Sequence, residues 1–215
     1  MGPHKTGTTS IQRLIKDEQA SLLAQGITPW SDLESTNAFH FAHAFIRPEL
    51  QTPMRLLGKV LPCTHALAAF ETWADTLGGG RRALVSSEAF CFLLTTEERL
   101  ALFGMLRRKF SDIRPILVRR AEKEWRRSWF AQLSRMGLAD RFEALPDAQR
   151  VTGDWYFDYD ALLRFWAGIG PTTVIDFDHE VAVHGSIIPA FLRSLGLADS
   201  ICARDYFLNV SEQRS

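Results

Sequence analysis

Apolar side chains recur at helical spacing over long stretches of the chain. Between residues 10 and 25 they recur every three or four positions, which predicts a helix, and Gly26 suits the left-handed turn that ends one. Thr95 and Glu98 form a capping-box pattern at the start of another helix. Further helices are predicted over 37–45, 64–77, 96–110, 122–136, 159–170 and 186–197. Within 122–136, the side chains expected to face inward are Trp125, Trp129, Leu133 and Phe130.

Short apolar runs that end in polar residues lie between these helices. They are "RALVSSEAF" (82–90), "IRPILVRR" (113–120) and "TTVIDFDH" (172–179), and each reads as a strand. Most of residues 28–62 show no clear period, and 138–153 read as loop. Because helices alternate with short apolar strands, we expect an α/β fold with a mainly parallel sheet.

Composition narrows the class of protein. A chain of 215 residues, 46% hydrophobic and 23% charged, is typical of one globular domain, which we place at 1–215. With 25 basic and 25 acidic residues, it lacks the basic excess of a general nucleic-acid binder. The spacing of Cys63, Cys91 and Cys202 matches no metal motif, so we expect reduced, mostly buried thiols and a cytoplasmic location. No apolar run is long enough to span a bilayer.

The segment "GPHKTGTTS" (2–10) directly precedes the first predicted helix. A loop in this place presents backbone N–H groups at the positive end of the helix dipole, which favours an anion. Gly7 lets the backbone approach a phosphate closely, and Lys5 adds a positive charge. The order differs from the Walker A motif, because here the lysine precedes the glycine. A plain Ser/Thr-rich helix start with a solvated lysine is the alternative interpretation.

The full string "GPHKTGTTSIQ" resembles the 5′-phosphosulfate loop of the sulfotransferases that use 3′-phosphoadenosine 5′-phosphosulfate (PAPS), and most of all their bacterial branch. The resemblance implies a three-layer α/β/α, P-loop-like fold and PAPS as the co-substrate. It implies a catalytic role for Lys5 as well as binding. It assigns the 5′-phosphosulfate to Lys5, Thr6, Gly7, Thr8, Thr9 and Ser10. Because the sequence shows no recognisable Mg²⁺-binding Asp and no Walker hydroxyl, we expect no metal requirement.

A PAPS site needs a second pocket for the 3′-phosphate. The sulfotransferase pattern is an arginine at a strand end followed by a serine eight residues later, and Arg120 and Ser128 have this spacing. Strand ends open into the crevice where ligands of α/β sheets bind, and arginine can donate two parallel hydrogen bonds to one phosphate. Arg119 is the competing residue. Alternation along a strand places the two arginines on opposite faces, so only one should enter the pocket, and the eight-residue spacing favours Arg120. A basic strand–helix junction with solvated arginines is the alternative.

Sulfuryl transfer to an alcohol also needs a base for the hydroxyl proton. Glu88 lies at the carboxyl end of the strand predicted in "RALVSSEAF", on the rim of the sheet where the phosphate loop is also expected. It is our candidate for the base. The alternative is a structural carboxylate that caps a helix or pairs with an arginine such as Arg119. His40 and His43 either line the acceptor pocket or lie on a helix surface, and neither is expected to be catalytic.

The resemblance continues in "YDALLRFWAGIGPTTVIDFDHE", "IIPAFLRSLGL" and "FLNVSE". In the family a central strand leads into the phosphate loop, whereas only Met1 and Gly2 precede "PHK" here. We therefore expect the first strand to be missing from this chain, and residues 1–215 alone to fold poorly or bind PAPS weakly.

The sequence thus predicts transfer of a sulfuryl group from PAPS to a hydroxyl of a carbohydrate or other small acceptor. Residues 28–62 and 138–157 are the segments expected to form the acceptor pocket. No nucleic acid or membrane span is expected as a partner. Two alternatives remain, which are a P-loop kinase or other NTP-using transferase, and a degraded homologue that binds nucleotide without turnover.

Overall fold

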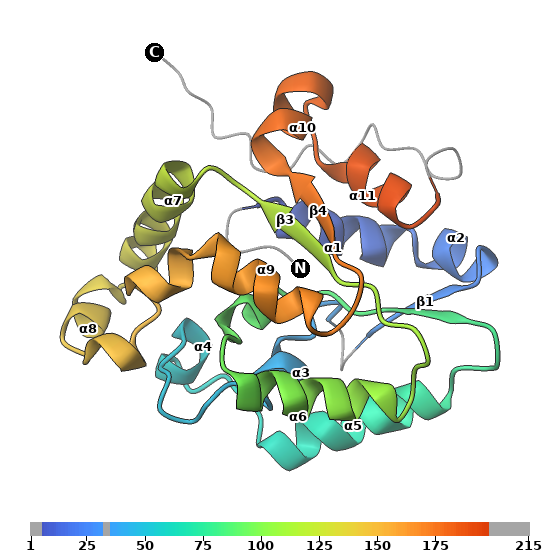
Figure 1. Ribbon diagram of the computed structural model, residues 1–215, viewed down its shortest axis with the longest axis horizontal. Helices are drawn as coiled ribbons and strands as arrows, with labels where there is room; N and C mark the ends of the chain where they lie inside the picture. The colour runs from blue at the N-terminus through green and yellow to red at the C-terminus, as the bar shows by residue number, and fades with distance from the viewer. Residues whose placement is uncertain (1–5, 32–34, 198–215) are drawn as a thin grey trace.

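The computed structural model describes residues 6–31 and 35–197, which form a mixed α/β fold (Figure 1). Strand β1 (Ile27–Pro29) pairs in parallel with β2 (Arg82–Leu84), and β3 (Ile116–Arg119) pairs in parallel with β4 (Thr173–Asp176). The predicted parallel pairing is therefore confirmed. Within the described residues it forms two sheets of two strands each, where we expected one.

The helices of the described residues surround these strands. The α-helices are α1 (Thr8–Asp17), α2 (Gln19–Ala24), α3 (Phe39–His43), α4 (Pro53–Leu56), α5 (Cys63–Asp75), α6 (Thr96–Arg107), α7 (Glu122–Arg135), α8 (Ala139–Glu143), α9 (Tyr159–Ala167), α10 (Phe177–His184) and α11 (Ile188–Ser194). Single 3₁₀ turns are η1 (Glu88–Phe92), η2 (Asp147–Gln149) and η3 (Asp154–Phe157).

The predicted first helix is two helices. The backbone leaves helical geometry at Glu18 (φ −101°, ψ 22°), and α2 starts at the next residue. The Glu18 carboxylate accepts a hydrogen bond from the Ser21 hydroxyl at 2.7 Å, which links the break to the first turn of α2. Gly26 has φ 72°, so the predicted left-handed end is confirmed.

Two further sequence predictions need correction. Residues 138–153 were expected as loop but contain α8 and η2, which are too short to give a periodic signal. The strand expected over 172–179 ends at Asp176, because the Asp176 carboxylate accepts the His179 N–H at 3.0 Å and begins α10. The capping box at Thr95 and Glu98 is present at the start of α6, as predicted.

Two clusters of buried side chains fill the interior. The first, which we call the strand core, joins α1 and α11 to all four strands through Ile11, Leu14, Ile27, Leu84, Val118, Ile175, Ile187 and Ile188. The second, the aromatic core, includes Trp30, Phe41, Phe70, Phe92, Trp125 and Trp129. Along β3, Leu117 packs in the aromatic core and Val118 in the strand core, so helices cover both faces of this strand.

The inward face of α7 was predicted nearly correctly. Trp125, Trp129 and Leu133 are fully buried, whereas Phe130 is 41% exposed. Of the cysteines, Cys91 is buried as expected, and burial raises the pKa of its thiol to about 12. Cys63 is exposed, so the expectation was wrong there, and Cys202 lies outside the described residues. None of the helices in the described ranges is both long and apolar enough to cross a membrane.

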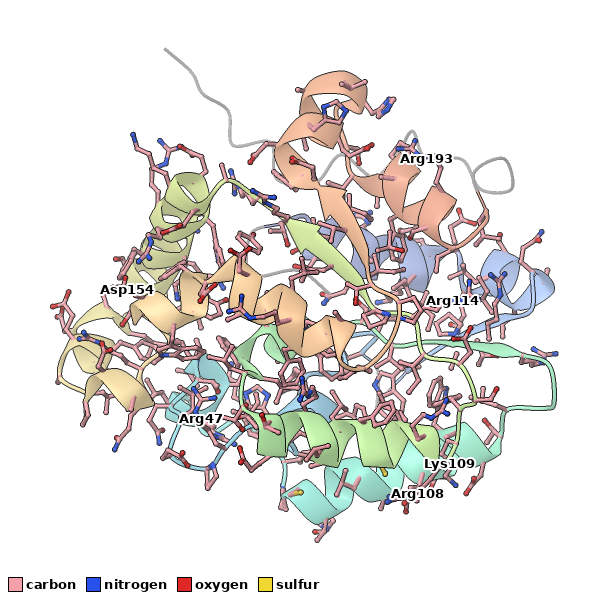
Figure 2. The ribbon with its side chains drawn as sticks, in the orientation of Figure 1. Arg47, Arg108, Lys109, Arg114, Asp154 and Arg193 are labelled. Carbon is pink, nitrogen blue, oxygen red and sulfur yellow. The ribbon has the colours of Figure 1, made fainter. Side chains whose placement is uncertain are left out.

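Most ion pairs of the described residues include an exposed side chain, and Figure 2 labels one member of several pairs, among them Arg114, Arg193 and Arg47. Pairs such as Arg114–Asp112 and Arg193–Glu180 involve largely exposed arginines, so each is expected to add at most about 1 kcal/mol. Arg47 differs, because its partner Glu98 is only 4% exposed and lies 3.1 Å from its guanidinium. This buried pair joins the start of α6 to the segment after α3.

Candidate functional site

The described part of the predicted phosphate loop begins at Thr6, so Lys5 lies outside the described residues. Gly7 has φ 77° and precedes the first residue of α1. Among described residues no side chain caps the start of α1, and its first turn holds no acidic residue. The partial positive charge at this end of the helix dipole is therefore not offset by a carboxylate of the first turn, and it favours binding of an anion.

The hydroxyl groups of this segment differ in exposure. Thr6, Thr8 and Ser10 are buried, and Thr9 is exposed. All four were predicted as donors to the phosphosulfate. Because three of them are buried, we expect backbone N–H groups of the first turn to be the main donors to an anion at this end of α1.

Arg120 and Ser128 meet at the carboxyl end of β3. The Arg120 Nη1 atom donates to the Ser128 Oγ atom at 3.1 Å, which is the pairing that their spacing predicts. The hydroxyl of Tyr159 accepts the Arg120 backbone N–H at 2.7 Å and so fixes the strand end. Burial raises the pKa of this phenol, which keeps it neutral.

Arg119 and Arg120 point in different directions. Arg119 is exposed, and its guanidinium lies 6.0 Å from the ring of Tyr159. Arg120 is half-buried and lies 4.9 Å from the ring centre of Phe177. The Asp178 carboxylate lies 3.6 Å from Arg120 and also accepts the Ala121 N–H at 2.7 Å. This carboxylate balances the charge of Arg120 in the structure.

The phosphate loop and Arg120 contact the same aromatic ring. A methyl group added to Gly7 would lie 3.3 Å from Phe177 and 2.7 Å from Ile187, so Gly7 is packed against both. Phe177 in turn lies beside the guanidinium of Arg120. The start of α1 and the end of β3 are therefore neighbours on one rim, although more than a hundred residues separate them in sequence.

Glu88 lies on a 3₁₀ turn that begins just after β2. The Ser87 Oγ atom accepts the Ala89 N–H at 3.1 Å and starts this turn. The Glu88 Oε2 atom accepts hydrogen bonds from Gln12 Nε2 at 2.9 Å and from Asn37 Nδ2 at 3.5 Å. Glu88 is thus held by Gln12 of α1 and by Asn37, and pairing with an arginine, one form of the structural alternative, is not among its contacts with the described residues.

The sequence analysis missed Gln12 and Asn37. Gln12 lies on α1, two residues after the predicted loop, and its backbone oxygen accepts the hydroxyl of Thr36 at 3.1 Å. Asn37 forms an isolated parallel bridge with Ser86, which brings its side chain beside Glu88. Neither contact has a sequence signal, because both join segments far apart in the chain.

A cavity of about 200 Å³ adjoins Glu88. Its walls come from α3, the start of α4, the η1 turn and the carboxyl end of α7. It is lined by Ser35, Asn37, Phe39, His43, Thr52, Pro53, Met54, Glu88, Ala89, Phe92, Gln132 and Met136. A second hollow of about 320 Å³ lies between α6 and α9 and includes Arg99 and Arg164, but it contains no residue that the sequence analysis proposed for the site.

His43 forms part of the cavity wall and is neutral. Its Nδ1 atom must donate to the Phe39 carbonyl at 2.6 Å, because a carbonyl only accepts. Its Nε2 atom therefore accepts from the Thr52 hydroxyl at 2.7 Å, and Thr52 Oγ1 accepts the Arg55 N–H. Burial lowers the pKa of His43 to about 4. Both nitrogens are occupied, so His43 suits a structural role and Glu88 remains the candidate base.

This buried histidine predicts a loss of stability in acid. The pKa of His43 is near 6.5 in the unfolded chain and about 4 in the folded one. The unfolded state therefore binds more protons as the pH falls through this window, and the free energy of unfolding decreases. We expect a loss of about 2 kcal/mol from this group between pH 7.5 and pH 5.

Urea unfolding of His43→Gln and of the control His65→Gln at both pH values measures this contribution. His65 is exposed on α5, so its variant should keep the pH dependence of the original chain. In His43→Gln the change in the free energy of unfolding between pH 7.5 and pH 5 should be smaller by about 2 kcal/mol. Equal pH dependence in the two variants would contradict a buried neutral His43.

Comparison of the chain with protein-family models, with curated proteins and with solved structures finds no match. The described residues also contain no cluster of His, Cys, Asp and Glu side chains arranged to hold a metal ion.

Proposed function

We propose that this protein transfers a sulfuryl group from PAPS to a hydroxyl of a small acceptor. One observation carries the proposal, which is that α1 joins the three predicted groups. Gly7, directly before its first residue, packs against Phe177 beside Arg120, and Gln12 in its second turn holds Glu88. A donor with two anionic groups and an alcohol acceptor would need two anion-binding elements and a base close together, and these contacts of α1 support that arrangement.

The donor would lie along the rim between α1 and β3. The start of α1, together with Lys5, is proposed to bind the 5′-phosphosulfate through N–H groups and positive charge. Arg120 and Ser128 are proposed to bind the 3′-phosphate, with Arg120 exchanging the Asp178 carboxylate for the phosphate. The finer fold assignment, a three-layer and P-loop-like domain, is part of this proposal and is supported by the helices on both faces of β3.

The reaction would be an in-line transfer. The acceptor oxygen forms a bond to sulfur while the bond from sulfur to the 5′-phosphate oxygen breaks. Glu88 takes the acceptor proton, and the 5′-phosphate leaves with the electron pair as adenosine 3′,5′-bisphosphate. Lys5 and the N–H groups of α1 stabilise the charge that grows on this phosphate. Because Gln12 and Asn37 occupy Oε2, we expect Oε1 of Glu88 to accept the proton.

The two adjacent arginines provide a matched test of the 3′-phosphate site. Arg120→Gln is expected to weaken binding of adenosine 3′,5′-bisphosphate by about a hundredfold, because a charged bidentate donor is lost. Arg119→Gln removes the same charge from the other face of β3 and should change the affinity by less than about threefold. Isothermal titration of both variants measures the difference. Equal losses would show that Arg120 acts only through net charge.

A transfer assay tests the function itself. The full chain is incubated with PAPS labelled in its sulfuryl group and with a panel of alcohols and sugars, and labelled sulfate esters are separated. We expect transfer that needs no added metal and that Lys5→Ala abolishes. Phosphate transfer from ATP under the same conditions would favour the kinase alternative. Tight binding of adenosine 3′,5′-bisphosphate with no transfer to any acceptor would favour a non-catalytic binder.

A further inference from the structure

We propose that the cavity beside Glu88 binds a compact, uncharged hydroxyl compound with an apolar body, about the size of one substituted ring, with its hydroxyl at Glu88. As an acceptor site this rests on the proposed function. As a binding site it stands on the cavity alone.

The size of the cavity sets the size of the ligand. It measures about 200 Å³. An apolar protein cavity of about 150 Å³ holds one benzene molecule. The present cavity therefore has room for one ring with a short substituent. A disaccharide or a fused-ring compound would need the surrounding helices to move.

The walls set the character of the ligand body. Phe39, Met54, Phe92 and Met136 line the cavity together with Pro53 and Ala89. The polar atoms of His43 and Thr52 are already used within the wall. Ser35, Asn37 and Gln132 add further polar groups at parts of the wall. A sugar hydroxyl that lies against the apolar side chains instead would be buried without a partner, at a cost in free energy. An apolar ring meets no such cost and gains contacts with the two methionines.

The charge of the lining sets the charge of the ligand. Among the described lining residues Glu88 is the one charged group, because His43 is neutral and no lysine or arginine takes part. An anion would be repelled by this carboxylate. An ammonium group would lose its water among apolar side chains, against a carboxylate that two amide groups already contact.

The end of the cavity near Glu88 also favours a hydrogen-bond donor. The Asn37 Oδ1 atom is buried and has no hydrogen-bond partner among the described residues, and the Nδ2 atom of the same amide faces Glu88. Glu88 and Asn37 therefore present more acceptors than the surrounding donors satisfy. A single hydroxyl supplies a donor here at little desolvation cost.

Protein-observed NMR without nucleotide tests this inference, with benzyl alcohol as the probe. Methyl glucoside, benzoate and benzylamine serve as polar, anionic and cationic comparisons. We expect benzyl alcohol to shift signals of α3, η1 and the end of α7, and to bind about tenfold more tightly than any comparison compound. No binding, shifts confined to other regions, or tighter binding of a comparison compound would overturn the inference.

Two filling variants locate the site. Met54→Trp and Met136→Trp add bulk from different helices, at positions that are only half-buried. Each should weaken benzyl alcohol binding at least about tenfold while the thermal unfolding midpoint stays near that of the original chain. If one variant fails to fold, the other still shows whether benzyl alcohol binds in the cavity. Unchanged binding in a folded variant would contradict the assignment.

Failure here can be told apart from failure of the proposed function. Binding of benzyl alcohol without sulfuryl transfer would support the cavity and contradict the transferase. Sulfuryl transfer to a sugar with no probe binding in the cavity would support the transferase and contradict the inference.

Discussion

Replacing Glu88 with Gln is expected to lower the rate constant for sulfuryl transfer by about a hundredfold to a thousandfold. The amide has the shape of the carboxylate but cannot take the proton from the hydroxyl group of the acceptor at neutral pH. Glu88 lies half-buried at the end of the cavity, and its Oε2 atom is fixed by Gln12. Steady-state kinetics with labelled PAPS measures the loss.

Two readouts separate a base from a structural carboxylate. The binding of adenosine 3′,5′-bisphosphate should be unchanged in Glu88→Gln, because Glu88 is not among the groups proposed to bind the donor. The KM for the acceptor should change little while kcat falls, because the amide keeps the shape of the carboxylate but removes the proton acceptor. Glu143→Gln, at an exposed site on α8, serves as the control and should keep full activity. Full activity in Glu88→Gln would remove Glu88 from the mechanism.

Replacing Glu98 with Ala is expected to lower the free energy of unfolding by about 3 to 5 kcal/mol. The buried carboxylate accepts the backbone N–H groups of Arg47, Leu94 and Thr95 at 2.7–2.8 Å, and it pairs with the Arg47 guanidinium. Without it, three N–H groups and one buried charge lose their acceptor at once.

Urea unfolding of Glu98→Ala and of the neighbouring Glu97→Ala measures this effect. Glu97 is exposed in the first turn of α6 and lacks the bond to Arg47, so its loss should shift the unfolding midpoint far less. Arg47 lies on the segment between α3 and α4, both of which form walls of the cavity. Equal shifts in the two variants would show that the Arg47–Glu98 pair contributes little to stability.

Local signals predicted the parts of the fold that depend on local contacts. The capping box fixes the start of α6, and the alternation of Leu117 and Val118 fixes the two faces of β3. The break of the first helix at Glu18 could not be predicted, because apolar residues keep their helical period across it. Strand β1 was also missed, since three residues are too few to show alternation.

In the candidate site, too, contacts set by local spacing could be predicted from the sequence, and contacts between distant segments could not. Arg120 and Ser128 could be paired from sequence, because a strand end followed by two helical turns fixes their separation. The Glu88 contacts could not, because Gln12 and Asn37 reach it from segments 76 and 51 residues away in sequence. The cavity is assembled from residues between 35 and 136, and only a tertiary structure brings such residues together.

The most direct test of the account is the affinity difference between adenosine 3′,5′-bisphosphate and 5′-AMP, measured by isothermal titration on the full chain. The two ligands differ only by the 3′-phosphate that Arg120 and Ser128 are proposed to bind. We predict that the bisphosphate binds at least about a hundredfold more tightly. Equal affinity for the two nucleotides, or a preference for ATP over both, would contradict a PAPS site formed by α1 and the end of β3.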